Sequence, residues 1–131
     1  MEIVIDTSAI IAVITGEPEK DKLIELTKGM TLLAPESVYW EIGNAFSAML
    51  KRRRATLDKI KMALGVFEKI PIRYIQDIEL DKALEIANRA NIYCYDAYLL
   101  RCCMKYKAPL LSLDKGLIRV AKDMSIEVLE V

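Results

Sequence analysis

The feature that most constrains this chain is an apolar run near the N-terminus that ends in an acidic residue. Residues 3–5 are Ile-Val-Ile, and three β-branched side chains in a row suit a strand buried on both faces of a parallel sheet. Asp6 follows directly, and Thr7 or Ser8 offers an N-cap for a helix that begins behind it. Open α/β sheets bind their ligands beyond the carboxyl ends of the strands. We therefore expect Asp6 at such an edge, where its carboxylate would hold a cation or cap a helix.

Strand-like and helix-like segments alternate along the rest of the chain. Apolar runs bounded by Pro, Gly or polar residues predict strands, and apolar side chains three or four positions apart predict helices. This alternation is typical of βαβ units, whose helices cover both faces of a parallel sheet. We predict one three-layer α/β/α domain over residues 1–131, with a central sheet of about five strands. The expected strands are 3–5, 31–34, 71–75, 109–113 and 126–131, and the expected helices are 9–14, 18–28, 35–54, 57–68, 79–90, 97–106 and 115–123.

The composition excludes several kinds of partner. No apolar run approaches the roughly 20 residues that span a bilayer, and the N-terminus lacks a secretion signal. We therefore expect a cytoplasmic protein with no membrane partner. The 19 basic and 19 acidic residues cancel, so attraction for a nucleic acid would have to come from a local patch. The dense basic run Lys51-Arg52-Arg53-Arg54 is either that patch or a solvated helix end.

The chain has no histidine and three cysteines, which narrows its chemistry further. Without histidine it has no Ser-His or Cys-His nucleophile, and the commonest general base is missing. Cys94, Cys102 and Cys103 match no zinc-ligand spacing and are expected to be buried, reduced thiols. Hydrolysis by this chain would rely on carboxylates, lysines or a metal ion.

Four acidic residues are predicted to meet at one edge of the sheet. Asp6 and Asp114 each follow a predicted strand, so in a parallel sheet both emerge at the carboxyl edge. Asp96 heads the helix that leads into the strand before Asp114, and Glu41 lies beside the apolar stripe of the long helix. Each has a structural alternative, which is helix capping for Asp96 and Asp114 and a solvent-exposed helix position for Glu41.

Carboxylates gathered in this way need a counter-charge. Two of them about 4 Å apart repel by about 4 kcal/mol at an effective dielectric constant near 20. Ligand sets made only of oxygen favour Mg²⁺ or Mn²⁺, and such an ion can activate water for phosphodiester hydrolysis. Ser8, Ser112 and Asn44 are expected beside the acids, where they would orient a ligand or the attacking water. Capping and strand-end roles stay open for the two serines.

The acids belong to four short motifs that occur in a recognisable order. These are Ile5-Asp6-Thr7-Ser8, Glu41-Ile42-Gly43-Asn44-Ala45, Tyr95-Asp96-Ala97-Tyr98-Leu99 and Leu111-Ser112-Leu113-Asp114. Together, over the whole chain, they resemble the PIN domain, and within that family the toxin ribonucleases of the virulence-associated protein C (VapC) type. The resemblance implies a Mg²⁺- or Mn²⁺-dependent endoribonuclease that is usually a homodimer and is inhibited by a cognate antitoxin in its active-site groove. It assigns catalysis and metal binding to Asp6, Glu41, Asp96 and Asp114, with Ser8 and Ser112 beside them.

Other functions stay open on the sequence. One is a PIN-like nuclease of RNA processing, and another is a binding module that acts mainly through a DNA-binding complex with its antitoxin. A receiver-like signalling domain would need paired acids after the first strand and a lysine after the last, and neither is found. Five aromatic residues could stack on RNA bases or on an antitoxin, but we expect them to pack in the core or in a dimer contact instead. They are Tyr39, Trp40, Tyr93, Tyr95 and Tyr98.

Overall fold

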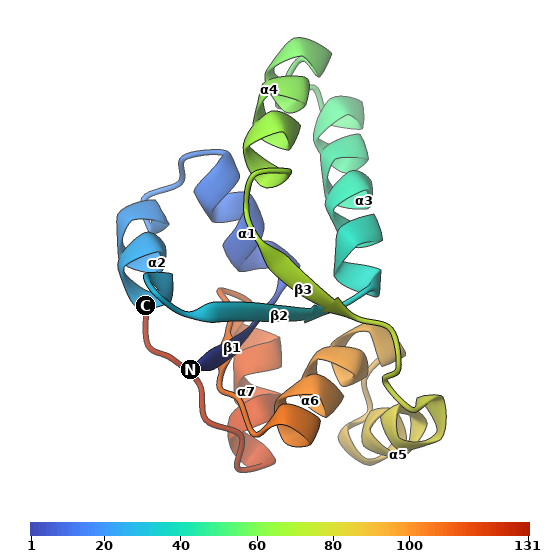
Figure 1. Cartoon of the computed structure of the whole chain (residues 1–131). Coiled ribbons are helices and arrows are strands. Elements are labelled where there is room, and N and C mark those ends of the chain that lie inside the picture. Colours follow the sequence, from blue (N-terminus) through green and yellow to red (C-terminus); the bar gives the residue numbers. More distant parts are fainter.

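A computed structural model describes all of residues 1–131 as a parallel sheet with helices on both faces (Figure 1). Helices α1 to α4 cover one face and α5 to α7 the other, which confirms the predicted three-layer α/β/α class. The strands, in the spatial order β3-β2-β1-β4, are β1 (Glu2–Ile5), β2 (Thr31–Pro35), β3 (Ile72–Ile75) and β4 (Leu110–Leu111). The helices are α1 (Thr7–Ile14), α2 (Lys20–Thr27), α3 (Ser37–Lys51), α4 (Leu57–Phe67), α5 (Leu80–Ala90), α6 (Cys94–Tyr106) and α7 (Lys115–Asp123).

The first strand is central and buried, as its β-branched run predicted. Val4 is fully buried and pairs in parallel with Leu33 of β2 on one side and Leu110 of β4 on the other. Both neighbours are also fully buried, so helices shield the middle of the sheet from above and below. This packing fixes the end of β1, and with it the position of Asp6.

The sheet has four strands, so the predicted count of about five is corrected. Residues 126–131 make a single parallel bridge between Leu110 and Val128 instead of a strand. They form no strand because their partner β4 has only two residues, of which only Leu110 pairs with them. Beyond β4 the chain turns towards Asp6, where the Ser112 hydroxyl accepts a hydrogen bond from the Asp114 backbone N–H at 3.0 Å.

Two helices begin earlier than the apolar pattern indicated, and both carry functional candidates. Helix α1 begins at Thr7 instead of residue 9 because Asp6 caps it. Helix α6 begins at Cys94 instead of residue 97, so Asp96 lies inside its first turn. None of the seven helices is both long and apolar enough to cross a membrane.

The three cysteines are free thiols, as predicted. Cys102 and Cys103 are buried in α6, whereas Cys94 at the start of that helix is only half-buried, which corrects the prediction for that residue. Burial raises the pKa of the Cys102 thiol to about 12 and also raises the pKa of Cys103. The two buried cysteines therefore act as small hydrophobic side chains.

Candidate active site

Asp6 lies at the carboxyl end of β1, with a side chain that is only 4% exposed. Its Oδ1 accepts hydrogen bonds from the Ala9 backbone N–H at 3.1 Å and from Ser8 Oγ at 2.7 Å, and its Oδ2 accepts one from Ser112 Oγ at 2.6 Å. A carboxylate has about four acceptor sites, so one on Oδ2 is left for a ligand. The N-cap of α1 is therefore Asp6, not Thr7 or Ser8, and capping leaves its ligand-binding capacity in place.

Ser8 and Ser112 fasten Asp6 to the segment that follows β4. Ser8 Oγ accepts a hydrogen bond from the Leu113 backbone N–H at 2.9 Å, and the two serine hydroxyls lie 3.5 Å apart. Each hydroxyl thus donates to Asp6 and also accepts a backbone hydrogen bond. Ser8 accepts from Leu113, 105 positions further along the chain, and Ser112 accepts from Asp114, two positions further. This network holds the Asp6 carboxylate in one orientation.

Glu41, in the second turn of α3, reaches the same edge of the sheet. Its Oε2 accepts a hydrogen bond from Thr7 Oγ1 at 3.3 Å, whereas its Oε1 is buried and has no partner. A buried acceptor without a partner costs about 1–3 kcal/mol, and more when it is charged. The sequence assigned Thr7 only to capping, and no local pattern predicts a contact that spans 34 positions.

Asp96 and Asp114 approach from two further helices. Asp96 is half-buried in the first turn of α6, and the N-cap of that helix is Tyr93, so the capping alternative is wrong for Asp96. Asp114 is exposed and caps α7, because its Oδ1 accepts from the Gly116 N–H at 2.9 Å and the Leu117 N–H at 3.2 Å. Asp114 therefore caps α7 through Oδ1, and its Oδ2 stays available for a ligand.

The charges of these acids act on one another. Burial raises the pKa of Asp6 more than its hydrogen bonds lower it, and the Asp114 charge adds to the rise. Burial likewise raises the pKa of Glu41, with further increases from Asp96 and Asp6, against a smaller decrease from the Thr7 hydrogen bond. The pKa of Asp96 is raised by burial and then by the Asp114 charge. Ionisation of one acid is thus opposed by its neighbours.

The four acids (Asp6, Glu41, Asp96 and Asp114) suit a hard divalent cation in their chemistry. All their donors are oxygens, Glu41 has a buried oxygen without a partner, and Asp6 keeps one free acceptor site. No three acidic or cysteine side chains lie together as a ready-made metal-binding group, however. Convergence of the four acids on one ion therefore stays a prediction, with these residues as its ligands.

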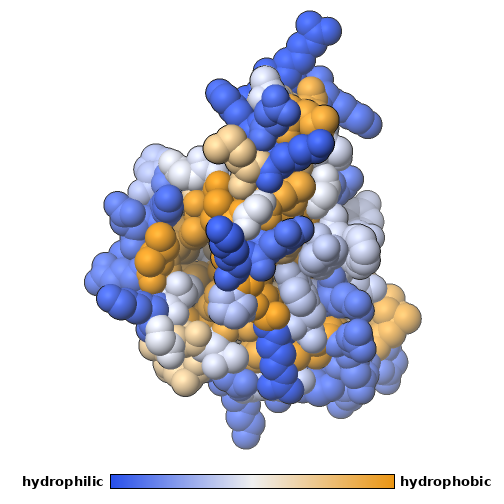
Figure 2. Space-filling model, turned by 45° about the horizontal axis from the view of Figure 1, so that its top comes forward, coloured by the Kyte–Doolittle hydropathy of each residue, from blue (hydrophilic) through white to orange (hydrophobic).

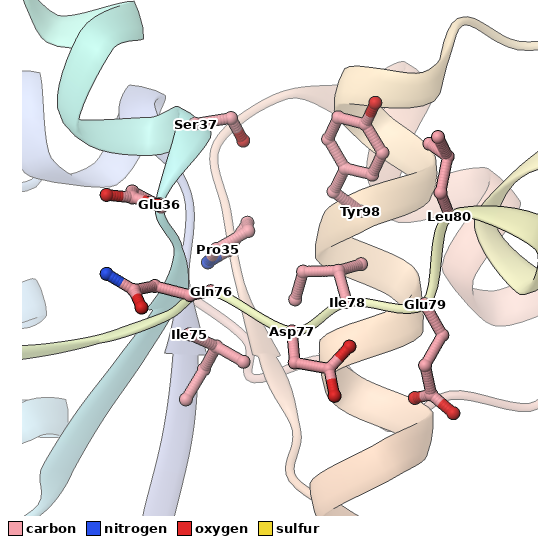
Figure 3. Close-up of a pocket in the computed structure, with 10 residues that line it drawn as sticks. All are labelled: Pro35, Glu36, Ser37, Ile75, Gln76, Asp77, Ile78, Glu79, Leu80 and Tyr98. Carbon is pink, nitrogen blue, oxygen red and sulfur yellow. The ribbon is translucent and has the colours of Figure 1, made fainter.

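Two hollows open near the start of α3 and share the side chain of Ser37. One is a groove of about 630 Å³ along α3, which contains Glu41 and the exposed Asn44 one turn further on. The other is a pocket of about 390 Å³ beyond the ends of β2 and β3, which Figure 3 shows between the start of α3 and α6. The groove is lined by Ser37, Trp40, Glu41, Gly43, Asn44, Ser47 and Tyr95.

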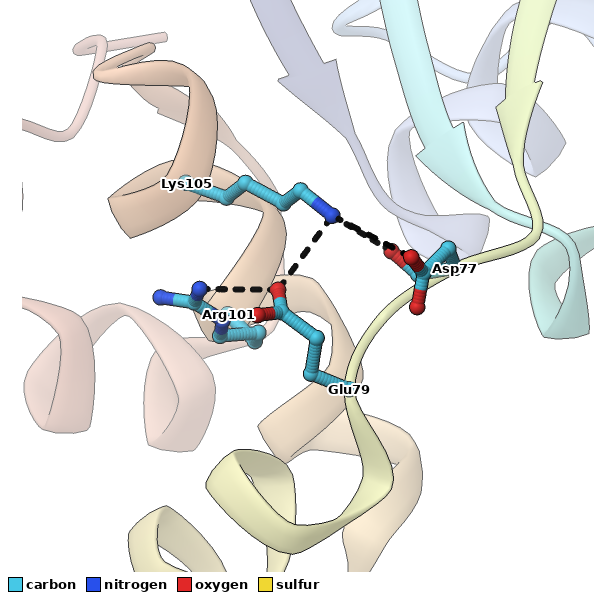
Figure 4. Close-up of polar contacts among 4 residues, drawn as sticks. All are labelled: Asp77, Glu79, Arg101 and Lys105. Carbon is cyan, nitrogen blue, oxygen red and sulfur yellow. Dashed lines mark hydrogen bonds and ion pairs between the residues drawn. The ribbon is translucent and has the colours of Figure 1, made fainter.

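Four charged residues fasten the segment before α5 to α6, the helix that carries Asp96 (Figure 4). Arg101 Nη2 lies 2.8 Å and Lys105 Nζ 3.2 Å from Glu79 Oε1, and Lys105 also donates to the Asp77 carbonyl at 2.9 Å. Glu79 has a φ of 62°, in the left-handed region that disfavours a residue with a side chain. The ion pairs therefore hold Glu79 in an intrinsically unfavourable backbone conformation.

We expect Arg101→Met to lower the melting temperature at pH 7. The Arg101 hydrogen bond is the main cause of the lowered pKa of Glu79, followed by that of Lys105. A lowered pKa contributes stability above the unfolded-state value near 4.5, and this contribution is lost as the pH falls through the folded-state pKa. The melting-temperature gap between wild type and Arg101→Met should therefore narrow below about pH 4.5.

Circular dichroism melts at several pH values would measure that gap. Lys122→Met is the control, because it removes only the exposed Lys122–Glu130 pair and should change the melting temperature little. A gap of the same size at every pH would show that Arg101 acts through packing and not through its charge.

The fold is thus a parallel α/β sheet with acids at its carboxyl edge, in a chain without histidine. The family model of the PIN domain matches residues 3–123, and the chain belongs to the PIN domain family. PIN domains are nucleases, so the chain is assigned to the hydrolases.

Solved structures share the fold at low sequence identity. PAE2754 from Pyrobaculum aerophilum is 20% identical with a TM-score of 0.67, covering 92% of this chain and 86% of that one. VapBC2 from Rickettsia felis, bound to a DNA fragment from its promoter, is 16% identical with a TM-score of 0.69, covering 99% and 98%. A toxin–antitoxin complex from Klebsiella pneumoniae is 12% identical with a TM-score of 0.57, covering 86% of each chain. No curated protein sequence matches the chain.

Proposed function

We propose that the chain is a Mg²⁺- or Mn²⁺-dependent endoribonuclease of the VapC type, the toxin of a toxin–antitoxin pair. The observation that carries the proposal is the set of acids at the carboxyl edge of the sheet, where Glu41 Oε1 is buried without a partner and Asp6 keeps one free acceptor site. Burial, and after it the charges of neighbouring acids, raises the pKa values of Asp6, Glu41 and Asp96, and a bound cation would offset both effects. Membership of the PIN domain family supports nuclease chemistry, and the proposal adds the metal ion and RNA as the substrate.

The residues would divide the work of phosphodiester hydrolysis. When bound, a divalent ion supplies a Lewis acid for the phosphodiester and lowers the pKa of a bound water. Asp6 keeps its orientation because Ser8 and Ser112 donate hydrogen bonds to it. Glu41 would hold the ion through Oε1, which is buried and free of hydrogen bonds, while the hydrogen bond from Thr7 keeps its Oε2 in place.

The antitoxin is the proposed partner, and a homodimer in the cytoplasm is the proposed state. The Rickettsia felis and Klebsiella pneumoniae neighbours are toxin–antitoxin assemblies, which supports a partner of that kind. The resemblance implies that the antitoxin occupies the active-site groove. A separate hydrophobic groove of about 600 Å³ between α1, α3 and α4 would also bury apolar side chains of an antitoxin segment. Figure 2 shows hydrophobic surface gathered below the hydrophilic tip of the α3–α4 pair. The hydrophobic residues that line this groove are Ile14, Phe46, Met49, Ala55, Ile60, Met62, Ala63 and Val66.

RNA cleavage by the purified chain tests the function directly. Fragments should form with Mg²⁺ or Mn²⁺ and not with a chelator, and sequencing their ends after a brief induction in cells would identify the substrate. Absence of cleavage with either ion would contradict the proposal. A growth assay with and without co-expression of a small open reading frame encoded beside the gene, where one is found, separates the alternatives, because an RNA-processing nuclease or a binding module should not arrest growth.

A further inference from the structure

Two aromatic side chains beside the acids face solvent. Trp40 is 68% exposed and Tyr95 is 60% exposed, so of the predicted packing in the core or in a dimer, the core is wrong for both and the dimer contact stays a prediction. Trp40 directly precedes Glu41 on α3, and Tyr95 directly precedes Asp96 on α6. Both line the groove of about 630 Å³ that contains Glu41. Two helices thus each present an aromatic ring next to an acid.

Each exposed ring has an aromatic neighbour that is nearly perpendicular to it. The rings of Trp40 and Tyr39 are 4.9 Å apart at 82°, and those of Tyr95 and Tyr98 are 6.1 Å apart at 89°. Such edge-to-face contacts restrict the rotation of a ring. An ordered, exposed ring stacks on a ligand with little loss of conformational entropy, which makes both residues suitable stacking surfaces.

The rest of the groove is polar and leads to a basic end. Trp40, Asn44, Ser47 and Lys51 follow one another at intervals of four, three and four residues, which places them on one face of α3. This strip extends about 16 Å along the helix axis. Side chains 51–54 at its end are all exposed, while Glu41 is the only charged residue that lines the groove. The strip therefore offers stacking near the acids and phosphate attraction away from them.

We propose that this α3 strip binds single-stranded RNA, with bases beside the cleaved bond stacked on Trp40 and Tyr95. Stacking of this kind requires unpaired bases, because the bases of a duplex are already stacked on one another. Asn44 and Ser47 would hydrogen-bond sugar or base atoms, and the basic end would hold phosphates. The inference rests on the proposed function, because it treats the acids as the place of cleavage.

Trp40 is the only tryptophan of the chain, so its fluorescence reports on the groove. The full chain carrying Asp6→Asn, which should bind without cleaving, is titrated in Mg²⁺ with a short RNA strand, its duplex, and an abasic strand. We expect quenching by the unpaired strand, and little by the duplex or the abasic strand. Loss of one stacked base costs about 1–3 kcal/mol, which is about a 5- to 150-fold weaker affinity.

Variants in the same background identify the residues. Trp40→Ala and Tyr95→Ala should each weaken the binding of a labelled unpaired strand, measured by fluorescence anisotropy, by about 5- to 150-fold. Tyr93→Ala is the matched control, because Tyr93 is 89% exposed and does not line the groove. Lys51→Gln should also reduce the slope of log Kd against log salt by about 0.7 if Lys51 contacts one phosphate.

The outcomes separate this inference from the proposed function. Equal affinities for Trp40→Ala, Tyr95→Ala and Tyr93→Ala would overturn the stacking inference even if the wild type cleaves RNA. Failure of the wild type to cleave would instead overturn the proposed nuclease. A homodimer that dissociates in Trp40→Ala, together with unquenched Trp40 fluorescence, would assign this surface to the dimer contact and overturn RNA stacking.

Discussion

Replacement of Asp6 by asparagine is expected to lower RNA cleavage by about 10³-fold or more while the fold stays intact. Asparagine keeps one oxygen that can accept the Ala9 backbone N–H, so the cap of α1 survives. It loses the negative charge and the second acceptor oxygen, which in the wild type faces Ser112 and has one site left for a ligand. Cleavage of a labelled RNA measures the loss, and circular dichroism verifies the fold.

Asp58→Asn is the matched control for this variant. Asp58 is an exposed acid in the first turn of α4, so the substitution removes the same charge away from the four acids. It should cleave at the wild-type rate. Full activity in Asp6→Asn would mean that Asp6 is only a helix cap, and the proposed active site would have to be abandoned.

The parts of the fold that the sequence predicts are those set by local pattern. The buried β1 follows from its β-branched run, and α7 matches its predicted bounds because the acid that ends the preceding apolar run also caps the helix. The rule that parallel strands share a carboxyl edge also places Asp6 and Asp114 near each other, in agreement with the effect of Asp114 on the pKa of Asp6.

The parts that escape prediction depend on contacts between distant segments. Residues 126–131 have strand-like polarity, but whether they pair depends on the length of β4, which no local pattern reports. The hydrogen bond from Thr7 to Glu41 joins two motifs that appear independent in the sequence. Exposure of Trp40 is likewise a tertiary property, because its helix could have turned either face towards the core. Stacking residues are therefore harder to predict than acids.

Without a divalent ion, Glu41→Gln is expected to be more stable than the wild type at pH 7. Burial raises the pKa of Glu41 in the fold above its usual value of about 4.5. A raised pKa contributes stability that is complete below the unfolded-state pKa and is lost as the pH rises through the folded-state pKa. In thermal melts at pH 7 with a chelator, Glu41→Gln should therefore have a higher melting temperature than the wild type. This difference in melting temperature should vanish below about pH 4.5. Glu25→Gln, a change of an exposed acid on α2, is the control.

Addition of Mg²⁺ or Mn²⁺ should make the wild type more stable than Glu41→Gln at pH 7. An ion that binds only the folded chain stabilises it by about 2.7 kcal/mol at 100 times its Kd, which corresponds to roughly 10 °C for a domain of this size. The wild type should gain this increase in melting temperature, whereas Asp6→Asn and Glu41→Gln should gain little because each lacks a carboxylate of the acidic set. If neither ion raises the wild-type melting temperature, the four acids do not form a metal site in the folded chain.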